Sequence, residues 1–179
     1  MAYFPDLSEY TYFELSKGRS LTRNVGWLDA MHDFPAEEAA SELLDLLWQY
    51  CLVLVLSTRG LHSCEFCSSE YPTYEARGDL KVLLGSAEIR VFSKSGDVYA
   101  APNLIYHYVS CHRYQPPAPF VAALHEGHEG PSPTTSAYFD RLKDLGLKWA
   151  ENPHVEEEPV CFRFVRTEKG IEREYIRRK

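Results

Sequence analysis

The sequence predicts an α+β fold in which a small antiparallel sheet packs against three or four helices. Three observations lead to this prediction. Residues 36–51 place apolar side chains at helical spacing, residues 87–101 have the pattern of two strands joined by a turn, and further helical segments follow this hairpin. Helices that are segregated to one side of a strand pair, instead of alternating with single strands, are typical of α+β proteins.

The composition is that of one globular domain. The chain has 179 residues, of which 45% are hydrophobic and 25% are charged, a balance that argues against a disordered chain. A domain of this length buries about 70% of its unfolded surface, so it needs no disulfides to fold. We expect a single α+β domain over residues 1–179, with the Gly-, Pro- and Ser-rich residues 127–133 as a flexible linker to a C-terminal extension.

The charge of the chain restricts its partners. The net charge is −7, which argues against a nucleic-acid or anionic-membrane surface and suits a basic protein partner. A basic cluster closes the sequence, and we interpret it as a solvated terminus. Its members are Arg173, Arg177, Arg178 and Lys179.

Two features predict a cytoplasmic protein. Residues 1–10 lack the basic and apolar regions of a secretory signal, and the longest apolar run, residues 51–56, is too short to span a bilayer. The chain has five cysteines, an odd number. In a reducing cytosol, closely spaced cysteines bind metal or perform redox chemistry more often than they form structural disulfides.

The first half of the chain predicts four elements. Aromatic and β-favouring residues over 8–15 indicate a short strand. Pro35 and two following glutamates suit a helix start, and the apolar spacing continues to about residue 50. Residues 52–57 are either a buried strand or the continuation of that helix, because short apolar runs do not separate the two cases. Residues 68–79 are polar, contain Pro72 and Gly78, and predict a long loop.

The second half predicts a hairpin and further helices. Residues 87–93 alternate apolar and polar side chains, the pattern of a strand with one face in water. A turn leads to the second strand, and Pro102 then opens a helix that ends before two further prolines. The expected elements after the first strand are a strand over 98–101, helices over 103–113, 119–124 and 135–145, and a strand over 160–165.

Two distant segments carry residues that zinc prefers as ligands. Cys64 and Cys67 form a Cys-x-x-Cys turn, and His107 and His112 are spaced as histidine pairs in zinc sites are. Because 39 residues separate Cys67 from His107, the spacing is too long for a small zinc finger. The sequence therefore predicts a zinc ion embedded in a larger fold.

Helical geometry does not settle which residue is the fourth ligand. Four residues turn an ideal helix by about 400°, so His107 and Cys111 share a face, whereas five residues place His112 well around the cylinder. His112 turns inward only if the last helical turn loosens. The set is thus Cys64, Cys67 and His107 with either His112 or Cys111, and His62 is a further ligand candidate or a partner of a ligand.

Two other interpretations of the cysteine pair remain open at this stage. A thioredoxin-like redox pair would open a helix inside a βαβ pattern, but Pro72 and a polar stretch follow here. Alternatively, the cysteines are buried free thiols and His107 is a hydrogen-bonded core histidine. Metal binding is the interpretation that uses both segments together.

The same residues resemble a family of small, uncharacterised bacterial proteins. The resemblance covers about residues 20–125 and rests on motifs at 24–29 (NVGWLD), 59–67 (RGxHxCxxC), 88–91 (EIRV), 99–109 (YAAPxLIxHYV) and 112–117 (HxYxPP). It implies a bacterial source and no particular activity. The family pattern includes His107 and His112 rather than Cys111, so the resemblance favours His112 as the fourth ligand.

Three functions compete. The first is a zinc-stabilised binding or regulatory protein without catalysis, since a closed site of two cysteines and two histidines is usually structural. The second is a zinc-dependent hydrolase with an open coordination position and His62, Glu65 or His112 as the base. The third, nucleic-acid binding through the metal module, is disfavoured by the charge.

Overall fold

The computed structural model describes residues 3–12, 21–58, 60–67, 72–126, 131 and 136–152, and the backbone of residues 161–167 and 170–176. The elements follow the chain in this order: β1 (Thr22–Asn24), α1 (Ser41–Cys51), β2 (Val53–Val55), β3 (Tyr74–Arg77), β4 (Leu80–Leu83), β5 (Glu88–Phe92), β6 (Val98–Pro102), α2 (Ile105–His112), α3 (Ala118–Glu126), α4 (Ala137–Asp144), β7 (Trp149–Glu151), β8 (Cys161–Thr167) and β9 (Gly170–Ile176).

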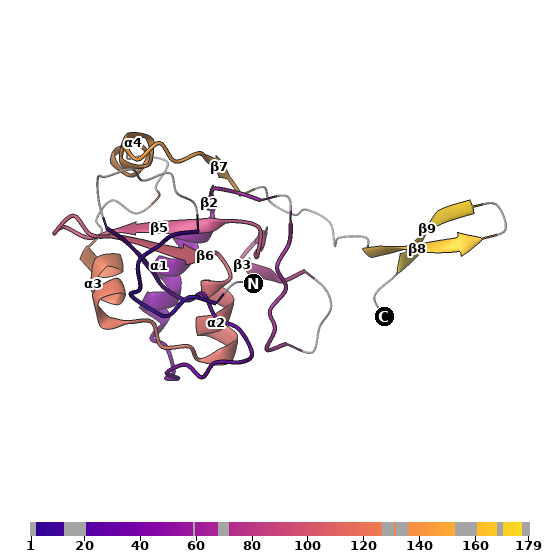
Figure 1. The fold of residues 1–179 in the computed structure, drawn as a ribbon, viewed down its shortest axis with the longest axis horizontal. Coiled ribbons are helices and arrows are strands. Elements are labelled where there is room, and N and C mark those ends of the chain that lie inside the picture. Colours follow the sequence, from indigo (N-terminus) through magenta and orange to yellow (C-terminus); the bar gives the residue numbers. More distant parts are fainter. Residues whose placement is uncertain are drawn as a thin grey trace.

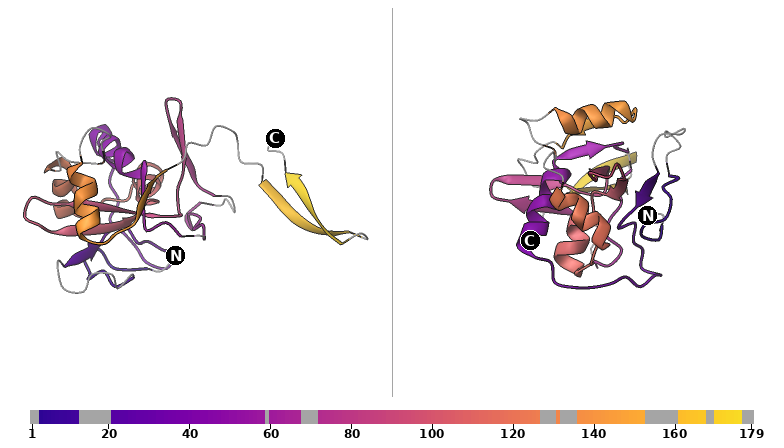
Figure 2. Two further views of the ribbon diagram at one scale, coloured as in Figure 1. Left: turned by 90° about the horizontal axis from the view of Figure 1, so that it is seen from above. Right: turned by 90° about the vertical axis from the view of Figure 1, so that its left-hand side faces the viewer.

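A five-stranded sheet forms the centre of the α+β fold, which confirms the predicted fold class. Its strand order is β1-β6-β5-β2-β7, and every pair is antiparallel except β1 with β6. The sheet is therefore mixed, whereas the sequence predicted an antiparallel one. Figures 1 and 2 show α2 and α3 on one side of this sheet and α4 on the other. Helix α1 contacts both α2 and α3.

Two small hairpins accompany the central sheet. Strands β3 and β4 pair with each other, and β8 pairs with β9 in a separate sheet. The predicted loop over residues 68–79 is thus wrong for 74–77, which form β3. Gly78 makes the turn between β3 and β4 with a φ of +58°, a backbone conformation that glycine adopts at little cost.

The strand predicted to have one wet face is buried on both faces. Glu88 and Arg90 in β5 are 3% and 2% exposed and form an ion pair with each other. The hydroxyl of Tyr10 donates to Glu88 Oε1 over 2.7 Å, and the ring of Tyr10 lies under the Arg90 guanidinium at 4.7 Å. The N-terminal segment therefore covers the face of β5 that the alternation of side chains predicted to be in water. Its Tyr10 interacts with both buried charges.

Helix α1 begins at Ser41, about five residues later than its apolar spacing predicted. The preceding residues are extended and pair with the chain that leaves α2. Ala36 forms a bridge with Tyr114, the amide of Glu37 donates to Arg113 O over 2.8 Å, and Pro35 O accepts from Gln115 over 2.8 Å. These non-local bonds satisfy backbone groups that a longer helix would have satisfied locally.

The remaining predictions divide into confirmed, corrected and untested ones. The hairpin β5–β6, the three helices after it and strand β8 are confirmed, and residues 53–55 are a strand rather than a helical continuation. Within residues 8–12 only an isolated bridge at Glu9 occurs in place of the expected strand, and residues 13–15 lie outside the described residues. The expected linker over 127–133, apart from residue 131, and the basic side chains at the C-terminus also lie outside them.

Trp27 anchors the segment after β1 on the core, as a large aromatic residue normally does. Its side chain is 4% exposed, and its Nε1–H donates to Ala100 O over 3.0 Å. In the part of the chain that the structure describes, no helix has the length and apolar character needed to cross a bilayer.

Replacing Glu88 with glutamine is expected to lower the free energy of unfolding by about 3–5 kcal/mol, because Arg90 would stay buried without a counter-charge. Urea unfolding followed by circular dichroism measures this loss. Tyr10→Phe is the matched control, because it removes one hydrogen bond to the same carboxylate and should cost about 1 kcal/mol. A loss for Glu88→Gln no larger than that of the control would contradict the burial of this pair.

Candidate metal centre

The Cys-x-x-Cys turn is held against the sheet by the chain before β5. The amide of Thr58 donates to Ser86 O over 2.7 Å, and the amide of His62 donates to Gly85 O over 2.9 Å. Gly85 has a φ of +89°, and a Cβ atom there would lie 2.1 Å from His62 O. Only glycine therefore allows the backbone that leads to Cys64 to come this close.

The two residues between the cysteines fix the orientation of the turn. The Glu65 carboxylate accepts a hydrogen bond from the amide of Ala30 over 3.2 Å. The Phe66 ring packs edge-on against Phe34 and Tyr108, with centroid separations of 5.2 and 5.7 Å. These contacts direct both thiols toward α2, so the turn does not depend on its own short sequence for its position.

Helix α2 brings two histidines five residues apart to the same place because its last turn is wide. The amide of Arg113 donates to Tyr108 O, five residues back, where an α-helix would use the fourth. A wider turn carries more residues per revolution, so His112 comes round toward His107. Arg113 then takes a left-handed conformation with a φ of +59° and ends the helix.

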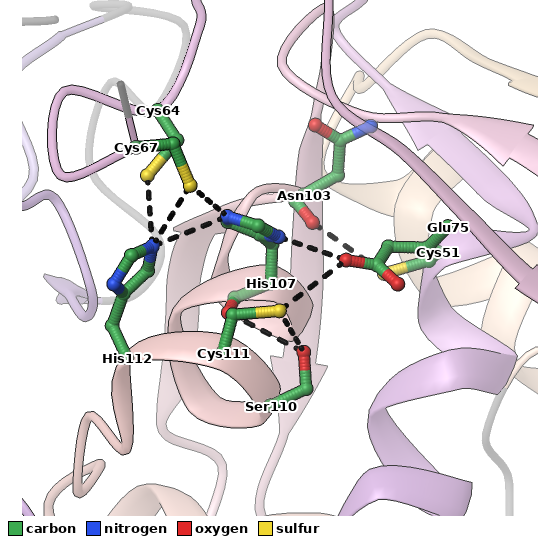
Figure 3. A network of polar contacts seen from close by, with 9 residues as sticks. All are labelled: Cys51, Cys64, Cys67, Glu75, Asn103, His107, Ser110, Cys111 and His112. Atoms are coloured by element: carbon green, nitrogen blue, oxygen red, sulfur yellow. Dashed lines mark hydrogen bonds and ion pairs between the residues drawn. The ribbon is translucent and has the colours of Figure 1, made fainter. Parts of the chain in front are cut away.

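Four ligand atoms meet between the turn and the helix (Figure 3). Cys64 Sγ lies 3.2 Å from His112 Nε2, and Cys67 Sγ lies 3.2 Å from His107 Nε2 and 3.3 Å from His112 Nε2. The two Nε2 atoms are 3.3 Å apart. The four atoms all lie within 4.8 Å of one another, so this cluster could hold a metal ion.

Glu75 orients the more buried of the two histidines. Its Oε1 atom lies 2.8 Å from His107 Nδ1. A carboxylate only accepts, so Nδ1 carries a proton, and in the neutral ring Nε2 then presents its lone pair to the cysteines. Such a carboxylate behind a histidine is the usual support of a metal ligand. Sequence reasoning missed Glu75 because it lies in β3, within the stretch that was predicted to be a loop.

Cys111 and His62 are not members of the four-residue cluster. The Cys111 thiol points toward Glu75 Oε1, 3.9 Å away, and lies 3.5 Å from Ser110 Oγ (Figure 3). It forms a second group with Glu75 and His107. His62 instead lines a small cavity, whose lining also includes Trp27, Thr58 and Glu88. The structure therefore gathers His112, and not Cys111, with Cys64, Cys67 and His107.

Burial shifts the pKa of two members of the cluster, Cys64 and His112. It raises the pKa of the Cys64 thiol to about 11, although hydrogen bonds from the amides of Phe66 and Cys67 act in the opposite direction. Burial, together with the neighbouring His107, lowers the pKa of His112. At neutral pH the metal-free protein thus keeps the Cys64 proton and a neutral His112, and a cation that bound the thiolate would release that proton.

Comparisons with known proteins give a family and nothing further. A family model described as "Domain of unknown function (DUF7919)" matches residues 2–125. This agrees with the resemblance to an uncharacterised family, whereas the bacterial source stays a prediction. No curated protein and no solved structure matches the chain.

Gly85→Ala is expected to lower the free energy of unfolding by more than about 3 kcal/mol, because left-handed strain and the clash with His62 O add. Gly96→Ala is the matched control. Gly96 has a φ of +98° and open space where a Cβ would lie. The Gly96→Ala substitution should therefore lower the free energy of unfolding by only about 1–2 kcal/mol. Chemical unfolding of both variants measures the difference, and equal losses would show that the approach of residue 62 to residue 85 is looser in solution.

Proposed function

The chain belongs to the DUF7919 family, a domain of unknown function, and we propose that it is a zinc-stabilised binding or regulatory protein without catalysis. The observation that carries this proposal is the convergence of two thiols and two imidazole nitrogens from two distant segments. Zinc favours this donor set, and four protein ligands close its tetrahedron.

The spacing of the donor atoms supports a zinc ion. Typical zinc–nitrogen and zinc–sulfur bonds imply tetrahedral edges of about 3.3 Å between two nitrogens and about 3.5 Å between nitrogen and sulfur. The corresponding separations here are 3.3 Å and 3.2–3.3 Å. Three of the four nitrogen–sulfur edges therefore need to expand by only about 0.3 Å to hold the ion, and all four atoms lie within 4.8 Å of one another.

The position of His112 favours a structural site over the alternative, a zinc-dependent hydrolase. A hydrolase needs three protein ligands and a water, so one of the four residues would have to stand back from the metal, and His112 is the ligand that helical spacing left open. Its Nε2 atom instead lies as close to the two sulfurs as that of His107 does to Cys67. With all four residues bound, no coordination position remains for a substrate.

A zinc ion at this position would connect three parts of the fold. The cysteines belong to the segment after β2, the histidines belong to α2, and Glu75 brings in the β3–β4 hairpin through His107. The segment 60–67 contains no helix or strand, so its own backbone contributes little to its stability. In small zinc peptides such a site contributes about 10 kcal/mol to folding at neutral pH.

Elemental analysis of the purified protein is expected to find about one zinc per chain, lost in the double variant Cys64→Ser, Cys67→Ser. Chelation should lower the melting temperature of the wild type and leave that of the double variant unchanged. Cys111→Ser is the matched control, because it removes an exposed thiol close to the cluster and should keep the metal. A wild type without metal that melts as the double variant does would refute the proposed site.

Glu75→Ala should weaken zinc binding by about 10–100-fold, because His107 loses the acceptor that fixes its ring and its tautomer. Competition with a chromophoric chelator measures the affinity. Glu75→Gln keeps a neutral acceptor in the same place and should recover most of the loss. If both variants bind zinc as the wild type does, then Glu75 does not support the site.

A further inference from the structure

We propose that the groove between residues 35–43 and 114–125 binds an amphipathic helix of a partner protein, with an apolar stripe flanked by Lys or Arg. This inference rests on the proposed function, since it identifies the surface and the class of partner of a binding protein. We define the partner groove as the cavity of about 870 Å³ between these segments.

The floor and walls of the partner groove are mainly apolar. The start of α1 and its preceding residues form one side, and the chain after α2 with the outer face of α3 forms the other. The volume lies within the range of about 300–1,000 Å³ typical of binding clefts. Its apolar lining residues are Pro35, Ala39, Ala40, Leu43, Tyr114, Pro116, Pro117, Ala118, Val121 and Ala122.

The charged residues of the partner groove are of one sign. Asp6, Glu37 and Glu38 line it, and no Lys or Arg belongs to its lining among the residues that the structure describes. Asp6 is occupied, since it accepts from the amide of Gly26 and the hydroxyl of Tyr114 over 2.8 Å each. Glu37 and Glu38 are exposed at the rim, and Glu37 accepts a hydrogen bond from the Gln115 side chain. Both carboxylates keep their negative charge there and would attract cations beside an apolar stripe.

An apolar cleft with an acidic rim selects one class of occupant. The apolar side chains of an amphipathic helix, spaced at i, i+3, i+4 and i+7, fit a groove between two elements. Lys or Arg on the flanks would meet the rim glutamates, whereas nucleic acid would be repelled by them. The net charge of −7 gives the same preference at long range.

The metal cluster and the partner groove share a wall. His112 ends α2, and the next residues include Tyr114, which lines the groove and pairs with Ala36 across it. On the inner side, the Phe34 ring contacts both Phe66 of the Cys-x-x-Cys turn and Tyr114, with centroids 5.2 and 5.8 Å away. Phe34 and Tyr114 therefore connect the Cys-x-x-Cys turn to the partner groove.

The test uses the zinc-loaded full chain and a fluorescein-labelled peptide of about 18 residues, with leucines at i, i+3, i+4 and i+7 and lysines elsewhere. Fluorescence anisotropy measures its dissociation constant. A peptide of the same composition in scrambled order is the control for bulk charge. Size-exclusion chromatography of the protein alone shows whether a second copy fills the groove.

Three variants locate the binding. Glu37→Lys with Glu38→Lys should weaken binding at least about tenfold. Asp140→Lys with Asp144→Lys makes the same charge change on α4, across the sheet, and should change it by less than about threefold. Val121→Asp should also weaken binding about tenfold, because it places a charge in the apolar floor, whereas attraction by bulk charge alone would strengthen it.

The inference is overturned if the ordered peptide binds no better than the scrambled one, or if the variants on α4 weaken binding as much as those at the rim. It is also overturned if the wild type is a dimer that Val121→Asp dissociates, since a second copy then occupies the groove. The zinc content of each variant is measured in parallel. A protein that holds zinc and ignores the peptide refutes only the groove, whereas a protein without zinc refutes the proposed function.

Discussion

The meeting of two thiols with two imidazoles is the constraint on which the rest of the site depends. The cysteines lie on a segment without helix or strand, and the histidines lie on a helix of eight residues. Neither element would hold these side chains in place alone. Each is fixed by contacts that reach across the chain, through Gly85 for the segment and through Glu75 for the helix. Residues far apart in the sequence thus act as one unit.

The same network reaches the surface of the protein. The wide last turn of α2 brings His112 to the cluster and sends the chain out in an extended path. There it pairs with residues 35–37, and this pairing delays the start of α1 until Ser41. A local distortion that serves the cluster therefore also shapes the partner groove, which explains why the two features lie side by side.

The family match contains all of these features. Residues 2–125 include the four residues of the cluster, Glu75, Gly85 and every residue that lines the partner groove. Helix α4 and strands β7, β8 and β9 lie beyond the match. Strand β7 nevertheless completes one edge of the central sheet by pairing with β2, so this part of the chain contributes to the fold.

The sequence alone predicted the fold class, the hairpin β5–β6, the helices that follow it and three residues of the cluster, Cys64, Cys67 and His107, because these depend on periodicity and short spacings. The choice between Cys111 and His112 required the three-dimensional structure, because it depends on the width of the last turn of α2. The structure also revealed Glu75, whose partner lies 32 residues away. The prediction that one face of β5 lies in water was wrong for the same reason. Glu88 and Arg90 interact with each other and with Tyr10, and the alternation of side chains along one strand carries no information about such distant partners.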